Sequence, residues 1–245
     1  MKKKFKTIIM ILIIILLVVM SIAFIKFKFK KDDKKVLDDI KIDKNDITDN
    51  KTERMLQVEK LKKINSDIVG WLEISETNIN YPVLQGSDND YYLTHNYKKE
   101  KTSGGSLFLD KSYDFSIPSS NLLIYGHRHE TGIMFEDLIK YKDEKFYKKH
   151  PNIRFTTCDE DSTYEIIAAF FSRVYYKSEK NVFRYYFFVN ADNVKDFDSY
   201  VENVKKASIY DTGKTAKYGD QLMTLSTCSY HTEDGRFAVV AKKVK

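Results

Sequence analysis

Short apolar or alternating runs, separated by Asn, Gly, Ser and Asp, dominate the chain from Val69 onward. Four of them, VGWLEI, INYPVLQ, GSLFLD and NLLIYGH, predict consecutive strands joined by turns. Three later runs, NIRFTT, TYEIIAAFFSRVYY and VFRYYFFV, also have strand composition, and DQLMTLSTC and RFAVVAKKV end the chain as two more strands. Short strands at this spacing predict a mostly β domain that forms a closed barrel or a sandwich.

Three segments have helical periodicity instead: residues 53–65, residues 132–151 and residues 190–210. Each has apolar residues three or four positions apart, which places them on one face. The first and third begin beside residues that can cap a helix. The candidate caps are Thr52, Asn190 and Asp192, and the apolar faces contain Met55, Val58, Leu61, Ile64, Met134, Leu138, Tyr141, Val194, Phe197, Val201 and Val204.

An uncharged apolar run of eighteen residues, 8–25, follows the basic amino terminus MKKKFK. This length is about what a helix needs to cross a bilayer, and the sequence after it lacks a convincing cleavage site for a secretory signal peptide. We therefore expect residues 1–7 to be a cytoplasmic tail, 8–25 a transmembrane anchor, 26–51 a charged stalk and 52–245 an extracellular domain. The expected localisation is the cell membrane, with a single pass.

The net charge of +6 belongs to the amino-terminal end of the chain. Residues 1–31 contain eight lysines and no acidic residue, so removing these eight charges leaves −2 on the remainder. This distribution gives no basis for nucleic-acid binding by the folded part. Cys158 and Cys228 could form one disulfide, but nothing in the sequence indicates that they are neighbours. His127 and His129 could supply half of a metal site, but no second ligand pair has matching spacing, so we expect neither a metal nor a cofactor.

Three residues at predicted strand ends could carry chemistry: His127, Cys228 and Arg236. A cysteine attacks carbonyl groups as the thiolate, which a nearby cation stabilises. A histidine can protonate a leaving amine and later deprotonate an incoming one, and an arginine can hold an oxyanion. Each residue also has an ordinary structural interpretation, as a buried filler, a turn residue or an edge-strand charge. Their spacing does not decide between these interpretations.

The segment TLSTC, with an arginine at the start of the following strand, resembles the sortase signature Thr-Leu-x-Thr-Cys…Arg. IYGHRHETGIMFEDL resembles the segment that bears the sortase histidine, and VGWLEISETNINYPVLQGSDNDYYLTHNY and GSLFLD resemble the early strands of class B sortases. The resemblance extends from about Thr52 to the carboxy terminus. It implies an eight-stranded β-barrel with amino-terminal helices and a helix between the sixth and seventh strands, for which residues 53–65 and 192–206 are the candidates.

The resemblance also implies that residues 52–245 form the catalytic domain of a cysteine transpeptidase. Cys228 would attack the threonine carbonyl of a carboxy-terminal sorting signal in a secreted protein, and an amine of a peptidoglycan precursor would resolve the thioester. His127 would act as general acid and then general base, and Arg236 would orient the signal and stabilise the oxyanion. By the same resemblance, the groove that binds the signal would be lined by Asn89, Leu93 and Ser226.

Several alternatives stay open on the sequence alone. His231 lies nearer to Cys228 in the sequence than His127 does, and it is the alternative base. Water in place of the amine would make the same site a hydrolase, and the same scaffold without the reaction would be a surface adaptor. The sorting motif is also open, because class B relatives use Asn-Pro-x-Thr-type signals or variants. The sequence also does not distinguish between a role in protein anchoring, in pilus assembly and in iron uptake.

Overall fold

The computed structural model describes residues 10–21, 52–115, 121–129, 131–191 and 193–245. The chain divides into two units, Met1–Lys41 and Ile42–Lys245. In the first unit, residues 10–21 form an α-helix with exposed side chains. The second unit contains the barrel and the candidate site.

The helix of residues 10–21 covers the middle of the predicted transmembrane anchor. Within the described part of the chain, no helix combines the length and the apolar character needed to span a membrane. The predicted localisation, a single pass through the cell membrane at residues 8–25, is therefore wrong. The predicted tail, 1–7, and the predicted stalk, 26–51, lie outside the described residues.

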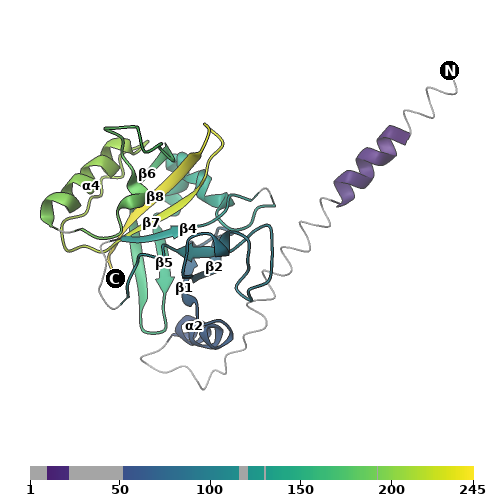
Figure 1. The fold of residues 1–245 in the computed structure, drawn as a ribbon, viewed down its shortest axis with the longest axis horizontal. Coiled ribbons are helices and arrows are strands. Elements are labelled where there is room, and N and C mark those ends of the chain that lie inside the picture. Colours follow the sequence, from purple (N-terminus) through teal and green to yellow (C-terminus); the bar gives the residue numbers. More distant parts are fainter. Residues whose placement is uncertain (1–9, 22–51, 116–120, 130, 192) are drawn as a thin grey trace. The chain divides into compact units, whose positions relative to one another are not determined.

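Eight strands of the second unit close into a β-barrel, as the sortase resemblance implies (Figure 1). They follow the order β1-β2-β3-β4-β7-β8-β6-β5, and β1 pairs with β5 to close the ring. The β2–β3 and β4–β7 pairs are parallel, and the other pairs are antiparallel. The strands are β1 (Ile68–Glu73), β2 (Asn80–Leu84), β3 (Leu107–Leu109), β4 (Asn121–Tyr125), β5 (Asn152–Thr156), β6 (Asp161–Arg173), β7 (Leu222–Cys228) and β8 (Gly235–Lys243).

The two longer helices of this unit lie where the sequence predicts them. α2 (Glu53–Ile64) precedes β1, and the Thr52 side chain accepts a hydrogen bond from the Met55 N–H at 3.3 Å, which confirms the predicted cap. α4 (Val194–Ala207) lies between β6 and β7, but its cap is Asn193 rather than either predicted residue. The short helices are η2 (Tyr91–Leu93), η3 (Glu136–Lys142), α3 (Glu144–Lys149) and η4 (Tyr185–Phe187).

Two predicted elements differ from the structure. The run VFRYYFFV, residues 182–189, is predicted as a strand but contains the 3-10 helix η4. Most positions of the run are aromatic, so it lacks the alternation of apolar and polar residues that is typical of a strand with one buried face. Tyr185 is instead fully buried, while Phe187 is 75% exposed. The helix predicted over 132–151 is divided into η3 and α3, because Asp143 ends the first and caps the second through its side chain.

The two faces of the barrel wall pack against different partners. Leu122 of β4 and Met223 of β7 face the interior and belong to the central core. Their neighbours Leu123 and Leu222 face outward, because successive side chains of a strand alternate, and they join a second cluster with Phe197 of α4. α4 and the segment that precedes it therefore cover the outer face of the sheet formed by β4, β7 and β8.

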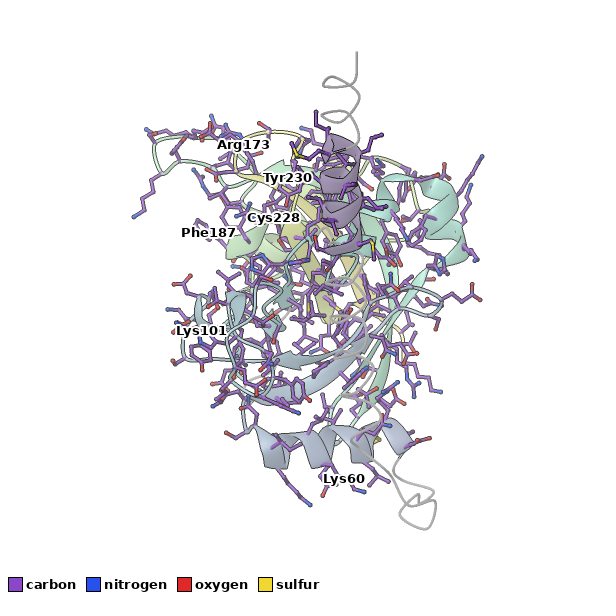
Figure 2. The ribbon with its side chains drawn as sticks, turned by 90° about the vertical axis from the view of Figure 1, so that its right-hand side faces the viewer. Lys60, Lys101, Arg173, Phe187, Cys228 and Tyr230 are labelled. Carbon is purple, nitrogen blue, oxygen red and sulfur yellow. The ribbon has the colours of Figure 1, made fainter. Side chains whose placement is uncertain are left out.

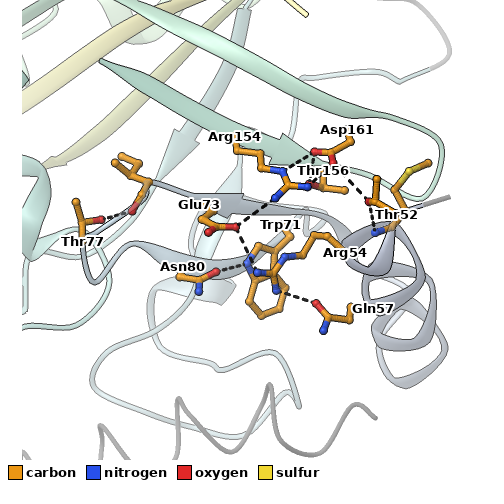
Figure 3. A network of polar contacts seen from close by, with 12 residues as sticks. Thr52, Arg54, Gln57, Trp71, Glu73, Thr77, Asn80, Arg154, Thr156 and Asp161 are labelled. Atoms are coloured by element: carbon orange, nitrogen blue, oxygen red, sulfur yellow. Dashed lines mark hydrogen bonds and ion pairs between the residues drawn. The ribbon is translucent and has the colours of Figure 1, made fainter. Parts of the chain in front are cut away.

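A polar network joins α2 to β1, β5 and β6 (Figure 3). The Arg54 guanidinium lies over the Trp71 ring, 4.7 Å from its centroid, and forms an ion pair with Glu73 at 3.3 Å. Glu73 is also 3.9 Å from Arg154, which donates a hydrogen bond to Asp161 at 2.8 Å. The Arg54 side chain is only 16% exposed, so both of its interactions are partly shielded from water.

We expect Arg54→Ala to lower the free energy of unfolding by about 1–2 kcal/mol, because it removes the contact with Trp71 and the ion pair with Glu73. Urea unfolding followed by circular dichroism measures the change. Lys62→Ala, an exposed change on the same helix, should stay within about 0.5 kcal/mol of the unsubstituted protein. If the free energy of unfolding fell equally in the two variants, the network would not be what holds α2 against the barrel.

Candidate active site

β4, β7 and β8 are neighbours in the barrel and bring the three candidate residues together. In the parallel β4–β7 ladder, Tyr125 is level with Ser226. His127 follows Tyr125 by two residues and therefore comes level with Cys228, the last residue of β7. In the antiparallel β7–β8 pair, Cys228 lies directly opposite Arg236. The pairing of strands thus places thiol, imidazole and guanidinium at one end of the sheet.

The outward row of side chains on β7 leads to the thiol. Thr224, Ser226 and Cys228 are two residues apart, so they share one face of the strand. Hydroxyls of the covering segment bind the first two: Tyr200 lies 3.0 Å from the Thr224 oxygen, and Tyr185 lies 2.7 Å from the Ser226 oxygen. Cys228 continues this row but is only partly buried. The thiol therefore lies where a covered sheet face opens to solvent.

Close packing fixes the backbone next to His127. A Cβ atom at Gly126 would lie 2.4 Å from the Leu107 side chain and 2.6 Å from the Phe135 ring, so the position requires glycine. The Thr227 hydroxyl donates to the Gly126 carbonyl at 2.8 Å, and the Phe135 N–H donates to the His127 carbonyl at 2.9 Å. The barrel wall thereby sets the position of the imidazole.

The His127 imidazole lies between Leu93 and Cys228. Its Nε2 is 2.8 Å from the Leu93 carbonyl, and because a carbonyl only accepts, Nε2 donates in this hydrogen bond. Nδ1 is the nitrogen left for the thiol. Hydrogen bonding between the two side chains raises the pKa of His127 and lowers the pKa of Cys228, and in both cases burial acts in the opposite direction. The pair is therefore biased toward thiolate and imidazolium.

Arg236 adds a second positive charge beside the thiol. The hydrogen bond from His127 is the largest cause that lowers the pKa of Cys228, and burial opposes it. The charge of Arg236 lowers this pKa further, while the charge of Asp234 raises it. The guanidinium donates through Nη1 to the Gly235 carbonyl at 2.9 Å and to the Asp234 carbonyl at 3.3 Å. Among the described residues, no carboxylate forms an ion pair with Arg236, so its charge stays available to a bound anion.

A pocket of ≈ 260 Å³ opens at this end of the sheet. Figure 2 shows Cys228 far from α2, whose Lys60 is labelled at the other end of the barrel. The pocket is lined by all six candidate site residues: Asn89, Leu93, His127, Ser226, Cys228 and Arg236. Ser226 is only 2% exposed and is bonded to a tyrosine hydroxyl, so it forms the floor rather than an open wall.

The aromatic walls of the pocket do not belong to the sequence motifs described above. These walls include Tyr125, Tyr185 and Tyr186. Tyr125 could have been found, because it stands two residues before His127 in a strand pattern and so shares its face. Tyr185 and Tyr186 belong to the run whose composition predicts a strand, and their positions depend on how this segment folds over the sheet. No local pattern in the sequence carries that information.

The other candidate residues lie outside the pocket. His231 does not line it: its Nδ1 is 3.0 Å from the Ser229 hydroxyl, and its ring contacts Phe171 with centroids 4.8 Å apart. Cys158 and Cys228 do not form a disulfide. In the described ranges, no group of three or more His, Cys, Asp or Glu side chains is arranged to hold a metal ion.

Comparison with known proteins defines the class of this one. The Sortase domain family model matches residues 72–244. Sortase B of Listeria monocytogenes is 38% identical over 186 residues, which cover 75% of this chain and 72% of that protein. The crystal structure of sortase B from B. anthracis in complex with AAEK1 has a TM-score of 0.75 and 32% identity, over 91% of this chain and 99% of that chain. The Staphylococcus aureus sortase B–substrate complex has a TM-score of 0.68 and 32% identity, over 78% of this chain and 86% of that one.

The chain therefore belongs to the sortase family. Within that family its relatives are sortase B proteins, which confirms the class B resemblance seen in the sequence. Sortases are transpeptidases, so the protein is an enzyme of this type. Family membership also implies protein substrates with sorting signals, and peptidoglycan as their destination.

In a Cys158→Ser background, we expect Cys228 to react with iodoacetamide below the ordinary thiol pH range, because its pKa is lowered. His127→Ala removes the largest cause of that shift, so the midpoint of the rate–pH profile should move up toward about 8.5. His231→Ala should leave the profile in place. If His127→Ala does not move the profile, the imidazole does not set the charge state of the thiol.

Proposed function

We propose that residues 52–245 form the catalytic domain and that Cys228, His127 and Arg236 carry out the transpeptidation. The main support is the register of the β4–β7 and β7–β8 ladders, which lines one pocket with all three side chains. The substrate in this proposal is a secreted protein with a carboxy-terminal sorting signal. The reaction divides one difficult exchange into two acyl transfers.

In the first transfer, the Cys228 thiolate attacks the carbonyl carbon of the threonine in the signal. The His127 imidazolium gives its Nδ1 proton to the leaving amine. The peptide bond after the threonine breaks, the following segment leaves as the amine, and the threonine remains as a thioester on Cys228. The lowered pKa of Cys228 and the raised pKa of His127 favour the charge states that this step needs.

In the second transfer, an amine of a peptidoglycan precursor attacks the thioester. His127, now neutral, takes the proton from this amine. A new amide bond forms, Cys228 leaves as the thiolate, and the site returns to its starting charges. Water in place of the amine would release a free carboxylic acid, which is the reaction of a hydrolase.

Arg236 stabilises the negative oxygen of the tetrahedral intermediates and orients the signal. Its position opposite Cys228, and its charge that no described carboxylate neutralises, support this role. Asn89 and Leu93 line the groove that receives the signal, and Ser226 forms its floor.

Mass spectrometry after incubation with peptides that carry Asn-Pro-x-Thr-type signals tests the first transfer. The protein should gain an acyl adduct on Cys228, and Cys228→Ala should gain none. Added triglycine should change the peptide product from the acid to the amide. Release of the acid regardless of added amine would identify a hydrolase. Absence of any adduct would contradict the proposed reaction and favour the surface adaptor.

Arg236→Ala should lower kcat by about 100–1,000-fold, because it removes a donor to the oxyanion. Arg236→Lys keeps the charge but loses the planar pair of donors, so it should restore only part of the rate. Single-turnover measurement of adduct formation separates this effect from peptide binding. A wild-type rate in Arg236→Ala would exclude Arg236 from the chemical step.

A further inference from the structure

A buried carboxylate stands behind one wall of the pocket. Asp110 is 7% exposed and follows β3, where its N–H donates to the Leu123 carbonyl at 2.8 Å. Its Oδ1 accepts hydrogen bonds from the N–H and the hydroxyl of Ser112. Its Oδ2 accepts from two residues that line the pocket, Asn89 Nδ2 at 2.9 Å and the Tyr125 hydroxyl at 3.1 Å. Asp110 itself does not line the pocket.

These contacts determine which atoms of Asn89 face the pocket. The Lys111 N–H donates to Asn89 Oδ1 at 2.8 Å, which identifies the oxygen end of the amide. Asp110 accepts one of the two hydrogens on Nδ2. One N–H of Asn89 is therefore left as a donor to a bound molecule. Without these partners the side chain could turn its amide over and offer an acceptor instead.

The same carboxylate determines how the Tyr125 hydroxyl is used. A carboxylate only accepts, so the hydroxyl donates its single hydrogen to Asp110, and its oxygen can only accept from the pocket side. Burial, followed by the charge of Asp110, raises the pKa of Tyr125, so the hydroxyl stays protonated. The ring packs against Phe108, its cross-strand neighbour, with centroids 5.3 Å apart.

One donor and one acceptor consequently lie beside each other on the pocket wall, because both groups bind the same oxygen of Asp110. A peptide group, with one C=O and one N–H, is complementary to this pair. We propose that Asp110 is a positioning residue that sets this pattern, through which Asn89 and Tyr125 hold a main-chain peptide group of the sorting signal. The inference rests on the proposed function of the pocket.

Asp110 acts on binding in this proposal and not on the thiol. It is absent from the groups that shift the pKa of Cys228. Its loss should therefore raise KM and leave kcat nearly unchanged, whereas loss of a group that acts in the transition state lowers kcat. This difference separates a positioning role from a catalytic one.

Asp110→Asn tests the proposal with a side chain of nearly the same shape. The new amide has one acceptor oxygen fewer, so the donor–acceptor pattern is no longer fixed. KM for a fluorogenic peptide with an Asn-Pro-x-Thr-type signal should rise about tenfold, with kcat within about twofold. The iodoacetamide profile of Cys228 should not move. A KM equal to that of the unsubstituted protein would overturn the inference.

A second comparison separates positioning from a general structural effect. Tyr125→Phe removes the acceptor but keeps the ring and Asp110, so it should also raise KM. The Asn89→Ala/Tyr125→Phe double variant removes both groups through which Asp110 acts. Adding Asp110→Asn to it should raise KM no further. A further multiplicative rise would show that Asp110 acts by another route and would overturn the inference.

Asp137→Asn is the matched control. Asp137 is another buried carboxylate, 5% exposed, which accepts from the Asn78 N–H at 2.9 Å and does not line the pocket. Its loss should lower stability and leave KM unchanged. An equal rise of KM in Asp137→Asn would overturn the inference. An unsubstituted protein that forms no adduct with any signal peptide would instead overturn the proposed function.

Discussion

The hydrogen-bond ladders that join β4, β7 and β8 are the constraint on which the site depends. They bring three residues from distant parts of the sequence to one end of one sheet face. A slip of one residue in either pairing would turn Cys228 toward the barrel interior, since side chains alternate between faces. The same slip would turn Leu225 of β7, which is fully buried in the core, to the outer face of the sheet. Core packing and the geometry of the site are therefore specified by one register.

Along β7 the outward side chains change from apolar to polar to reactive. Leu222 packs in the cluster under α4, and Thr224 and Ser226 bind the hydroxyls of Tyr200 and Tyr185. An unpaired hydroxyl in this covered region would be costly, so these pairs allow tyrosines to pack on the sheet. The cover ends beside Cys228, where Tyr185 also becomes a wall of the pocket. The segment between β6 and β7 thus completes the core through α4 and shapes the binding site through η4.

Much of the barrel can be predicted from the sequence, because its strands alternate or form short apolar runs between turn residues. The two capped helices follow from their three- and four-residue spacing. The segment 182–189 could not be predicted, since an aromatic run without alternation has no preferred face. The convergence of His127 and Cys228 depends on a parallel pairing between strands that are distant in sequence, which local patterns do not encode. In the sequence, similarity to a known family identifies these residues, and spacing alone does not.

The charges around the thiol explain why two different cations are present. In the proposed reaction, negative charge moves from the Cys228 sulfur to the substrate oxygen while His127 loses its proton to the leaving amine. A guanidinium is a permanent cation in proteins, so Arg236 supplies the positive charge that stays constant through this step. Its Nη1 is held by backbone carbonyls, which orient the group without cancelling its charge. A carboxylate in their place would bind the guanidinium more strongly and would weaken its attraction for the oxyanion, so the neutral partners suit the proposed role better.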